Sequence, residues 1–570
     1  MSLTAVPVYL WGRTFCSARN ALVAAALTLA VPGLAYAGFV MTEVAFYPVL
    51  CLAAWAIARM LERPTLARQA VAVVAIGLAL ATRLQAIVLV PVLFAAAGLV
   101  VVFDRTWLRG LRRYAPALGT LVAVGAVVVV AKVARGGSVQ GSLLGAYRVT
   151  GNVSYGFGDA LRFALYHAGD VLILTAVFPV VALVILVARA VAGDEPSAGA
   201  RAYLAVAASL TVGLVVEVGI FASRLLGRLA ERNLLGLAPV FFLALALWLE
   251  RGAPRPRVVV AAASAAALVL LALLPPGKLF VRAAEPDAFA LIPLVRLHVH
   301  APDLDLRAVV VLGGAALLAL FAFVPRRLAW LLPVLAFVLL AASSISVSRV
   351  VAAESTLFRP AMVGTEERWI DDAARGRVAY VYAGERGWSG GGPVWMNLFW
   401  NERIRRVYDL FGVRAAGPLP QTAARIGSDG TLLPALTTPY VVASGRDTFA
   451  GTRITTNAGA GLALWRVGPP VRLVSREYGV DRATGIVAGA ARILAYGCRG
   501  GRLALSIGAP EDRVVEVTVN GRVARKIALR KRIPWRGSVA APASAHCTFV
   551  VAGRGGGFYF DRLRFEQRRF

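Results

Sequence analysis

The chain has 570 residues, of which 58% are apolar and only 16% are charged, whereas ordinary soluble domains carry about 25% charged residues. Its mean hydropathy of +0.70 excludes a soluble globule for the chain as a whole. The net charge of +30 raises the question of nucleic-acid binding, because a basic surface is the electrostatic signature of such proteins. Much of this charge lies in short loops between apolar segments, which favours the lipid bilayer as partner and no nucleic acid.

Apolar segments with almost no charge recur up to about residue 350 and then stop. A helix needs roughly 20 apolar residues to cross the hydrocarbon layer of a bilayer. We therefore predict a polytopic helical membrane domain over residues 1–350, with residues 2–12 as the end of a partial span. About eleven complete spans are expected, at 20–37, 43–60, 67–82, 84–103, 115–134, 170–190, 201–222, 234–250, 257–274, 307–324 and 328–347.

The loops between these spans alternate in charge, and the arginine-rich loops fall on one side. The positive-inside rule places such loops in the cytoplasm. The opposite side carries longer loops with most of the aromatic and histidine residues, at 38–42, at Arg83 and at 135–169, 223–233 and 275–306. Abundant Ala and Arg indicate a GC-rich bacterial genome. We expect a multi-pass protein of the bacterial cytoplasmic membrane whose functional face is extracytoplasmic.

Beyond residue 350 the sequence changes to short alternating runs separated by Gly, Pro and Thr, a pattern typical of β-strands. Residues 351–470 are interpreted as a small α/β unit with a helix over 393–410. Residues 471–570 are interpreted as a β-sandwich that binds carbohydrate. With an odd number of spans before it, this whole domain is expected to be extracytoplasmic.

Two groups of residues in the second domain are candidates for a specific role. Flat aromatic rings stack on sugar faces, so Trp388, Trp395 and Trp400 are candidate glycan-binding residues, with burial in a core as the alternative. Cys498 and Cys547 would form a disulfide if the domain lies in an oxidising compartment.

Two charged residues stand at ends of spans on the expected functional face. Glu43 opens a span, where its carboxylate could accept a proton from a hydroxyl or hold a sugar; the alternative is a helix-start residue that complements the helix dipole. Arg83 interrupts a long apolar stretch. A cation at such a depth suggests a functional site, here a clamp for a lipid phosphate, with a snorkelling side chain as the alternative.

The loop 223–233 holds Arg224, Arg228 and Arg232, which would line one face of a continuing helix. Such a row could cradle the phosphate of a donor, or it could be a solvated surface. Glu217, in the preceding span, is expected to pair with one of these arginines.

Further polar residues of the same face are candidates for contact with a sugar or an acceptor. His298 and His300 are two residues apart and could be ligands of a divalent cation. No third ligand accompanies them, so we predict no metal site and no cofactor. These substrate-binding candidates are Tyr147, Tyr155, His167, Glu231, His298 and His300.

The run PGLAYAGFVMTEVAFYPVL and its continuation resemble polytopic GT-C glycosyltransferases that use polyprenyl-phosphate-linked sugars, such as protein mannosyltransferases, aminoarabinose transferases and arabinofuranosyltransferases. In that group an acidic residue follows an outward span, as Glu43 does here. A Gly-Leu-Ala-x-x-Thr-Arg stretch comes next, matched at 77–83, and Glu231-Arg232-Asn233 is similar to a later Glu-Arg-Tyr. The resemblance covers roughly residues 5–350 and implies that Glu43 assists catalysis while the arginines hold the donor phosphate.

The resemblance has one departure. Enzymes of this group begin with a first span and an outer loop carrying the acid usually taken as catalytic base, and this chain starts after that point. We expect either a start assigned too late or a diverged, inactive member.

Three functions stay open from the sequence. The first is a membrane glycosyltransferase that moves a sugar from a polyprenyl-phosphate carrier to an envelope glycan or protein on the outer face. The second is a transporter or flippase of lipid-linked sugars, which would favour polar residues and broken helices at midplane. The third is a non-catalytic, glycan-binding membrane scaffold.

Overall fold

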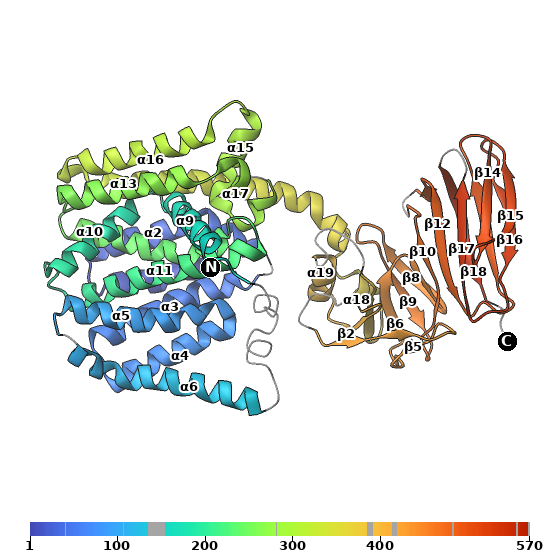
Figure 1. Cartoon of the computed structure of the whole chain (residues 1–570), viewed down its shortest axis with the longest axis horizontal. Coiled ribbons are helices and arrows are strands. Elements are labelled where there is room, and N and C mark those ends of the chain that lie inside the picture. Colours follow the sequence, from blue (N-terminus) through green and yellow to red (C-terminus); the bar gives the residue numbers. More distant parts are fainter. Residues whose placement is uncertain are drawn as a thin grey trace. The chain divides into compact units, whose positions relative to one another are not determined.

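The computed structural model describes residues 1–39, 41–106, 108–134, 154–280, 282–384, 392–412, 419–481, 484–553 and 557–567. The chain divides into two compact units, Met1–Ala352 and Ala353–Phe570 (Figure 1). The division lies close to the change in composition at residue 350.

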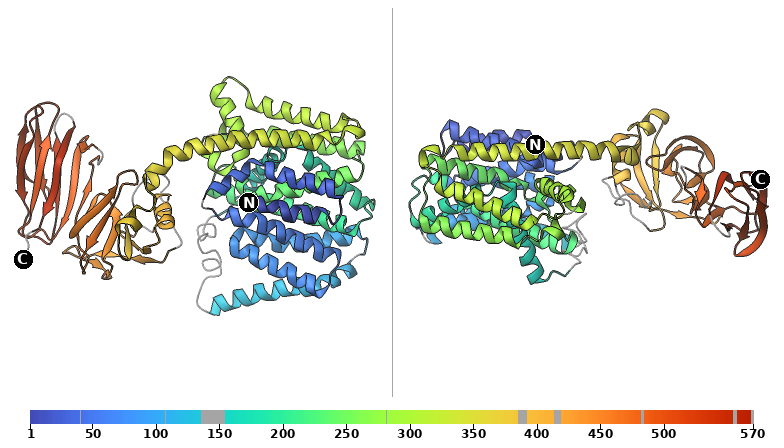
Figure 2. Two further views of the ribbon diagram at one scale, coloured as in Figure 1. Left: turned by 180° about the vertical axis from the view of Figure 1, so that it is seen from behind. Right: turned by 90° about the horizontal axis from the view of Figure 1, so that it is seen from above.

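The first unit consists of helices that run side by side, as the views from behind and above also show (Figure 2). Short 3₁₀ segments, labelled η, connect several of them. The longer helices are α1 (Ala5–Gly12), α2 (Ala18–Ala30), α3 (Glu43–Glu62), α4 (Leu66–Thr82), α5 (Leu89–Phe103), α6 (Ala115–Ala134), α9 (Phe157–Leu174), α10 (Phe178–Ala192), α11 (Ala198–Leu225), α12 (Ala238–Glu250), α13 (Arg257–Leu273), α15 (Ile292–His300), α16 (Leu306–Phe323) and α17 (Leu331–Val363). The short segments are η1 (Ser2–Thr4), η2 (Pro32–Gly38), η3 (Leu84–Val88), η4 (Leu108–Tyr114), η6 (Glu231–Asn233), η7 (Leu235–Leu237), α14 (Pro276–Leu279), η8 (Arg282–Asp287), η9 (Phe289–Leu291) and η10 (Arg326–Leu328).

Among the described residues, six helices are long and apolar enough to cross a membrane, and up to eight cross if each of two bent pairs counts as one span. Each expected span contains at least one of these helices or a shorter apolar one, such as α4 or α13. The count of eleven spans stays a prediction.

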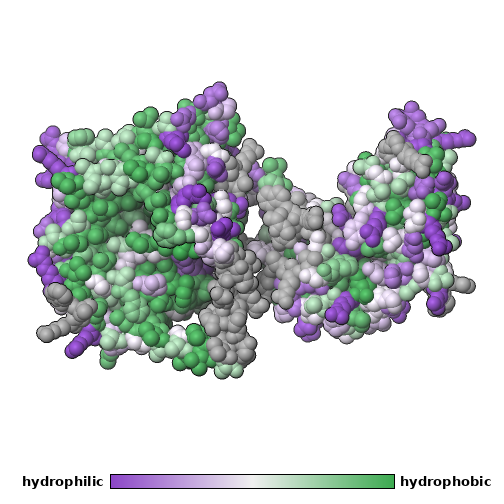
Figure 3. All heavy atoms as spheres, in the orientation of Figure 1, coloured by the Kyte–Doolittle hydropathy of each residue, from purple (hydrophilic) through white to green (hydrophobic). Residues whose placement is uncertain are grey.

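The helical unit has an apolar exterior. α12 is buried from Ala238 to Trp248, whereas α4 and α6 expose Val71, Leu78 and Val127 by 59%, 59% and 66%. Figure 3 shows apolar atoms along the sides of this unit and hydrophilic atoms at its ends. Exposed apolar area of this extent would be costly in water, at about 25 cal/mol per Å². The unit is therefore a multi-pass membrane protein domain with lipid-facing sides.

The arginine-rich loops gather at one end of the bundle, as their charge pattern predicts. Contacts between them involve carboxylates and carbonyls of neighbouring loops. They join Arg251 to Glu195 (2.6 Å), Arg201 to Asp104 (2.9 Å), Asn20 to Glu250 (2.6 Å) and Arg105 to the carbonyl of Ala192 (2.7 Å). We call this end of the unit the basic end.

The segment around residue 176 differs from the prediction. The span expected at 170–190 is broken, because α9 ends at Leu174 and α10 starts at Phe178 with a bend of 109°. Ala176 and Val177 have φ values of 61° and 67°, in the left-handed region that disfavours a β-branched residue. The expected loop 135–169 is helical from Phe157 onwards.

The second unit begins with a six-stranded mixed sheet in the order β3-β2-β1-β6-β9-β8. The strands β3, β2, β1 and β6 are parallel to one another, and β9 is antiparallel to both β6 and β8. The elements here are α18 (Trp369–Ala373), β1 (Val378–Tyr382), α19 (Gly392–Trp400), β2 (Ile404–Asp409), β3 (Gln421–Ala423), β4 (Arg425–Ile426), β5 (Leu432–Leu433), β6 (Tyr440–Ser444), β7 (Asp447–Phe449), β8 (Gly451–Asn457) and β9 (Leu462–Val467). The helix expected over 393–410 ends at Trp400, and its second half is strand β2.

Two further sheets follow, in the orders β15-β14-β17-β12-β10-β7 and β11-β18-β13-β16. Cys498 and Cys547 are joined by a disulfide with a Cα–Cα distance of 6.2 Å. β7 lies before residue 470, yet it pairs with β10, so a sheet crosses the expected boundary between the two parts. The strands are β10 (Leu473–Tyr478), β11 (Ile486–Val487), β12 (Ala490–Tyr496), β13 (Arg502–Gly508), β14 (Arg513–Val519), β15 (Arg522–Leu529), β16 (Trp535–Ala540), β17 (His546–Gly553) and β18 (Phe558–Glu566).

Candidate functional site

Residues 286–289 lie at the end of the helical unit opposite the basic end, in contact with Tyr36. The hydroxyl of Tyr36 donates to the carbonyl of Pro286 at 3.1 Å. The ring of Tyr36 stacks on Phe289 at a centroid distance of 4.0 Å. These contacts bring Asp287 beside the ends of α3, α4 and α11.

Five charged side chains at this end form a continuous series of ion pairs. Arg83 Nη1 lies 2.5 Å from Glu43 Oε1, and Arg232 Nε lies 3.7 Å from the same oxygen. Arg232 Nε is 3.1 Å from Asp287 Oδ1, and Arg228 Nε is 2.5 Å from Asp287 Oδ2. We call Arg83, Glu43, Arg232, Asp287 and Arg228 the ion-pair chain.

The position of the first pair follows from local structure. Glu43 is the first residue of α3, where a carboxylate complements the positive end of the helix dipole. Arg83 caps the C-terminus of α4 in an extended conformation, and its Nη2 donates to Asn233 Oδ1 at 2.7 Å. Its guanidinium also lies 5.8 Å from the ring centroid of Phe46, within the range of cation–π attraction.

Burial divides the ion-pair chain into two parts. Glu43, Asp287 and Arg83 are only 6%, 3% and 9% exposed, whereas Arg232 and Arg228 are 25% and 36% exposed. Removing one partner of a buried pair leaves an uncompensated charge, which is costly. Glu43 and Arg83, which we call the inner pair, are therefore suited to hold the site in shape. The outer arginines, Arg228 and Arg232, are accessible to an anion.

The three arginines of 223–233 do not line one helical face. α11 ends at Leu225, and Gly227 has a φ of 65°, the left-handed conformation that commonly ends a helix. Arg224 stays on the surface, 3.5 Å from Asp159, while Arg228 and Arg232 turn towards Asp287.

Glu217 also differs from its expected pairing. It lies within electrostatic range of Arg83, whereas the three loop arginines pair with Asp159, Asp287 and Glu43. Since Glu217 is on α11, this places a third carboxylate near the inner part of the ion-pair chain.

His167 and Glu231 hold the backbone of the site, in contrast to their expected contact with substrate. His167 is fully buried on α9; its Nδ1 bonds to the carbonyl of Phe163 at 2.7 Å, and its Nε2 accepts from the amide of Ala230 at 3.0 Å. Both carboxyl oxygens of Glu231 accept from the amide of Ala290, at 3.0 and 3.1 Å. Burial raises the pKa of the Glu231 carboxyl to about 8.

The remaining candidates of this unit are dispersed. Tyr147 lies outside the described residues, and Tyr155 lies just before α9. His298 is exposed and lines a cavity of about 310 Å³ with Asp305 and Arg307. His300 is exposed, with Nδ1 2.8 Å from the carbonyl of Arg296. No group of three or more metal-ligating side chains occurs among the residues described.

The aromatic candidates of the second unit have different surroundings. Trp388 lies outside the described part of the chain. Trp395, on α19, is 53% exposed. Trp400 packs edge-to-face against Phe399 at 5.0 Å, and its Nε1 is buried without a hydrogen-bond partner. Of the described tryptophans in this group, Trp395 has the ring available to a sugar face.

Two buried acids of the helical unit, one of them in the ion-pair chain, were not selected from the sequence. Asp287 stands directly before the apolar run AFALIPLV, which is a local signal of its burial. Asp170, on α9, is fully buried, and neither of its carboxyl oxygens has a hydrogen-bond partner. Its position directly before the apolar run VLILTAVF was the local signal.

Comparison with known proteins bears on the first part of this site. Residues 1–132 match the family model described as dolichyl-phosphate-mannose-protein mannosyltransferase. No curated protein matches the chain. Together with the apolar helices, the family match supports a membrane glycosyltransferase of the GT-C type. The family implies a sugar donor carried on a polyprenyl phosphate, and Glu43 and Arg83 lie within the matched residues.

Proposed function

We propose that the protein transfers a sugar from a polyprenyl-phosphate carrier to an envelope glycan or protein on the outer face of a bacterial cytoplasmic membrane. The observation that carries the proposal is the ion-pair chain, which unites residues of the family-matched segment with Arg228, Arg232 and Asp287. A site of this kind needs fixed cations and a carboxylate side by side.

The roles follow from the chemistry of transfer. The bond between the sugar carbon and the carrier phosphate breaks, and the phosphate retains the electron pair. Arg228 and Arg232 are the accessible cations of the ion-pair chain, so they stabilise the charge on the phosphate through charge-assisted hydrogen bonds. Asp287 orients both guanidinium groups. Arg83, 9% exposed and paired with Glu43, supports the site from within.

The new glycosidic bond needs an acceptor oxygen that loses its proton. A positioned carboxylate can take that proton as a general base. We assign an assisting role to Glu43, whose carboxylate lies between Arg83 and Arg232. Tyr155, His298 and His300 stay candidates for contact with the sugar or the acceptor.

Substitution of Arg232 tests the proposal. With a radiolabelled polyprenyl-phosphate sugar in membranes, Arg232→Ala should lower transfer by about ten- to a hundredfold, since a hydrogen bond to a charged group is worth about 1.5–3 kcal/mol. Asp287→Asn should also lower it, because the two arginines lose their common partner. Arg224→Ala is the matched control, as Arg224 pairs with Asp159 outside the ion-pair chain.

If Arg232→Ala transferred sugar at the rate of the wild type, the ion-pair chain would have no role in donor binding. A wild-type chain that releases no carrier phosphate from any polyprenyl-phosphate sugar would favour the glycan-binding scaffold instead.

The outer-face assignment has a separate test. Alkaline phosphatase is active only outside the cytoplasm, so a fusion after Phe570 should be active if the second unit is extracytoplasmic. An inactive fusion, made at a normal level, would reverse the assigned orientation and place the ion-pair chain on the cytoplasmic side.

A further inference from the structure

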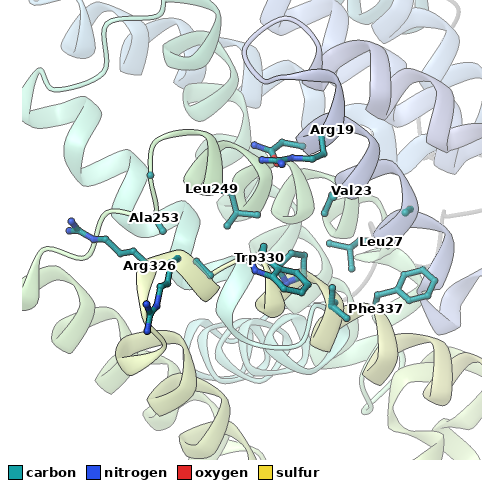
Figure 4. Close-up of a pocket in the computed structure, with 15 residues that line it drawn as sticks. Arg19, Val23, Leu27, Leu249, Ala253, Arg326, Trp330 and Phe337 are labelled. Atoms are coloured by element: carbon teal, nitrogen blue, oxygen red, sulfur yellow. The ribbon is translucent and has the colours of Figure 1, made fainter.

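A second cavity lies in the helical unit, at the basic end and away from the ion-pair chain. It has a volume of about 770 Å³ and is lined by the start of α2, the end of α12, and η10 with the start of α17 (Figure 4). All of these elements belong to the first unit. The proposed sugar transfer does not use this cavity.

Three arginines form the polar rim of the cavity. Arg19, Arg326 and Arg327 are exposed, and in the described parts of the chain no carboxylate forms an ion pair with any of them. The acid nearest in sequence to the lining residues, Glu250, is already occupied. Its Oε2 accepts from Asn20 Nδ2 at 2.6 Å and from the hydroxyl and amide of Ser17 at 2.7 and 3.0 Å.

A fourth cation adds to this excess of positive charge. Arg255 donates to the carbonyl of Val324 at 2.5 Å, and its guanidinium lies 5.3 Å from the ring centroid of Trp248. Its Nε and Nη2 are buried without a hydrogen-bond acceptor. Burial, and then the positive charge of Arg326, lower the pKa of Arg255. Arg255 and Arg326 thus repel each other, and an anion among the arginines of the rim would offset this repulsion.

Below the rim the cavity is apolar. Val23, Leu27, Trp330 and Phe337 line it, and Figure 4 shows Val23, Leu27 and Phe337 on the side away from Arg326. Trp330 and Phe337 are 57% and 43% exposed. From Arg19 to Leu27 the helix rises by about 12 Å, so the wall can cover part of an extended acyl chain. A free inorganic anion would leave this apolar wall uncovered.

We propose that this cavity binds one anionic glycerophospholipid of the leaflet at the basic end. Its phosphate lies among Arg19, Arg326 and Arg327, which can form paired hydrogen bonds to phosphate oxygens. One acyl chain follows the wall from Trp330 towards Phe337. The lipid joins the segment 326–337 to the start of α2 and the end of α12, so it holds three separate parts of the bundle together.

The experiment uses the full chain in zwitterionic nanodiscs and follows tryptophan fluorescence. Brominated phosphatidylglycerol should quench the emission, and Trp330→Phe should lose most of the quenching while it keeps the apolar wall. Brominated phosphatidylcholine should quench much less. Arg326→Gln/Arg327→Gln should weaken phosphatidylglycerol binding about thirtyfold, given the attraction expected for two basic residues near an anionic lipid.

A matched double variant of the same end, Arg63→Gln/Arg112→Gln, should bind like the wild type, because neither residue lines the cavity. Equal quenching by both lipids, or unchanged binding by Arg326→Gln/Arg327→Gln, would overturn the proposal. So would displacement by millimolar inorganic phosphate, which would indicate a free-anion site, or tighter binding of polyprenyl phosphate, which would assign the cavity to the carrier. None of these measurements depends on sugar transfer.

Discussion

Substitution of Arg83 by Met tests whether the inner pair of the ion-pair chain stabilises the folded bundle. The guanidinium lies 2.5 Å from the carboxylate of Glu43, and the two side chains are 9% and 6% exposed. Removing one partner of a buried pair costs about 3–5 kcal/mol. Because Arg232 is a second cation at 3.7 Å from Glu43, the loss should lie at the lower end, about 3 kcal/mol.

The double variant Glu43→Gln/Arg83→Met distinguishes a pair from two independent residues. With both charges gone no buried charge is left unpaired, so the double variant should be more stable than the sum of the single losses implies. Unfolding in mixed micelles, followed by circular dichroism, measures each free energy. Arg224→Met, at a surface pair with Asp159, is the control and should change little. Strictly additive losses for Glu43 and Arg83 would refute the coupling.

Three further predictions concern separate parts of the chain. The Glu231 carboxyl has a pKa of about 8 against an ordinary 4.5, so its contribution to stability is full below about pH 4.5 and is lost as the pH rises through about 8. Over that pH window the melting temperature of Glu231→Gln should therefore fall less steeply than that of the wild type. Parallel curves of melting temperature against pH would contradict this. The disulfide between Cys498 and Cys547 closes a loop between residues separated by 49 positions, and it should add roughly 4 kcal/mol to the free energy of unfolding. The double variant Cys498→Ser/Cys547→Ser should therefore unfold at a lower denaturant concentration. An unfolding midpoint equal to that of the wild type would argue against this contribution. Envelope polysaccharide should quench the fluorescence of the exposed Trp395, and quenching that survives in Trp395→Phe would place any glycan contact elsewhere.

Hydropathy alone located several helices of the first unit closely. The segment expected at 43–60 is α3, Glu43–Glu62, and that expected at 67–82 is α4, Leu66–Thr82. Apolar composition suffices there because the sides of the bundle face lipid along the whole length of a helix. The break before α10 could not be found in this way, since Ala176 and Val177 are apolar and adopt a conformation their side chains disfavour. Pro179, in the first turn of α10, was the local signal.

The site was predicted as separate residues, and their arrangement was not. Glu43 and Arg83 were each selected from their position at the end of a span, but a contact between residues forty positions apart leaves no periodic pattern. The prediction that Arg224, Arg228 and Arg232 line one helical face was wrong. It continued the helical period through Gly227, but α11 ends at Leu225 and Gly227 has a φ of 65°. Asp287 lies beside the stacked rings of Tyr36 and Phe289, a contact between distant segments that no local pattern specifies.

The pairing of β7 with β10 limits how the second unit can be divided. A fragment cut at residue 470 would keep β10 but lose β7, leaving an open strand edge that invites association between copies. It would also lose Asp447, whose fully buried Oδ1 lies 3.3 Å from Nη1 of Arg476. Arg476 is only 4% exposed, so the fragment would retain a buried positive charge without this partner. Residues 353–570 should therefore be kept together as one folding unit in gene fusion, domain exchange and recombinant expression.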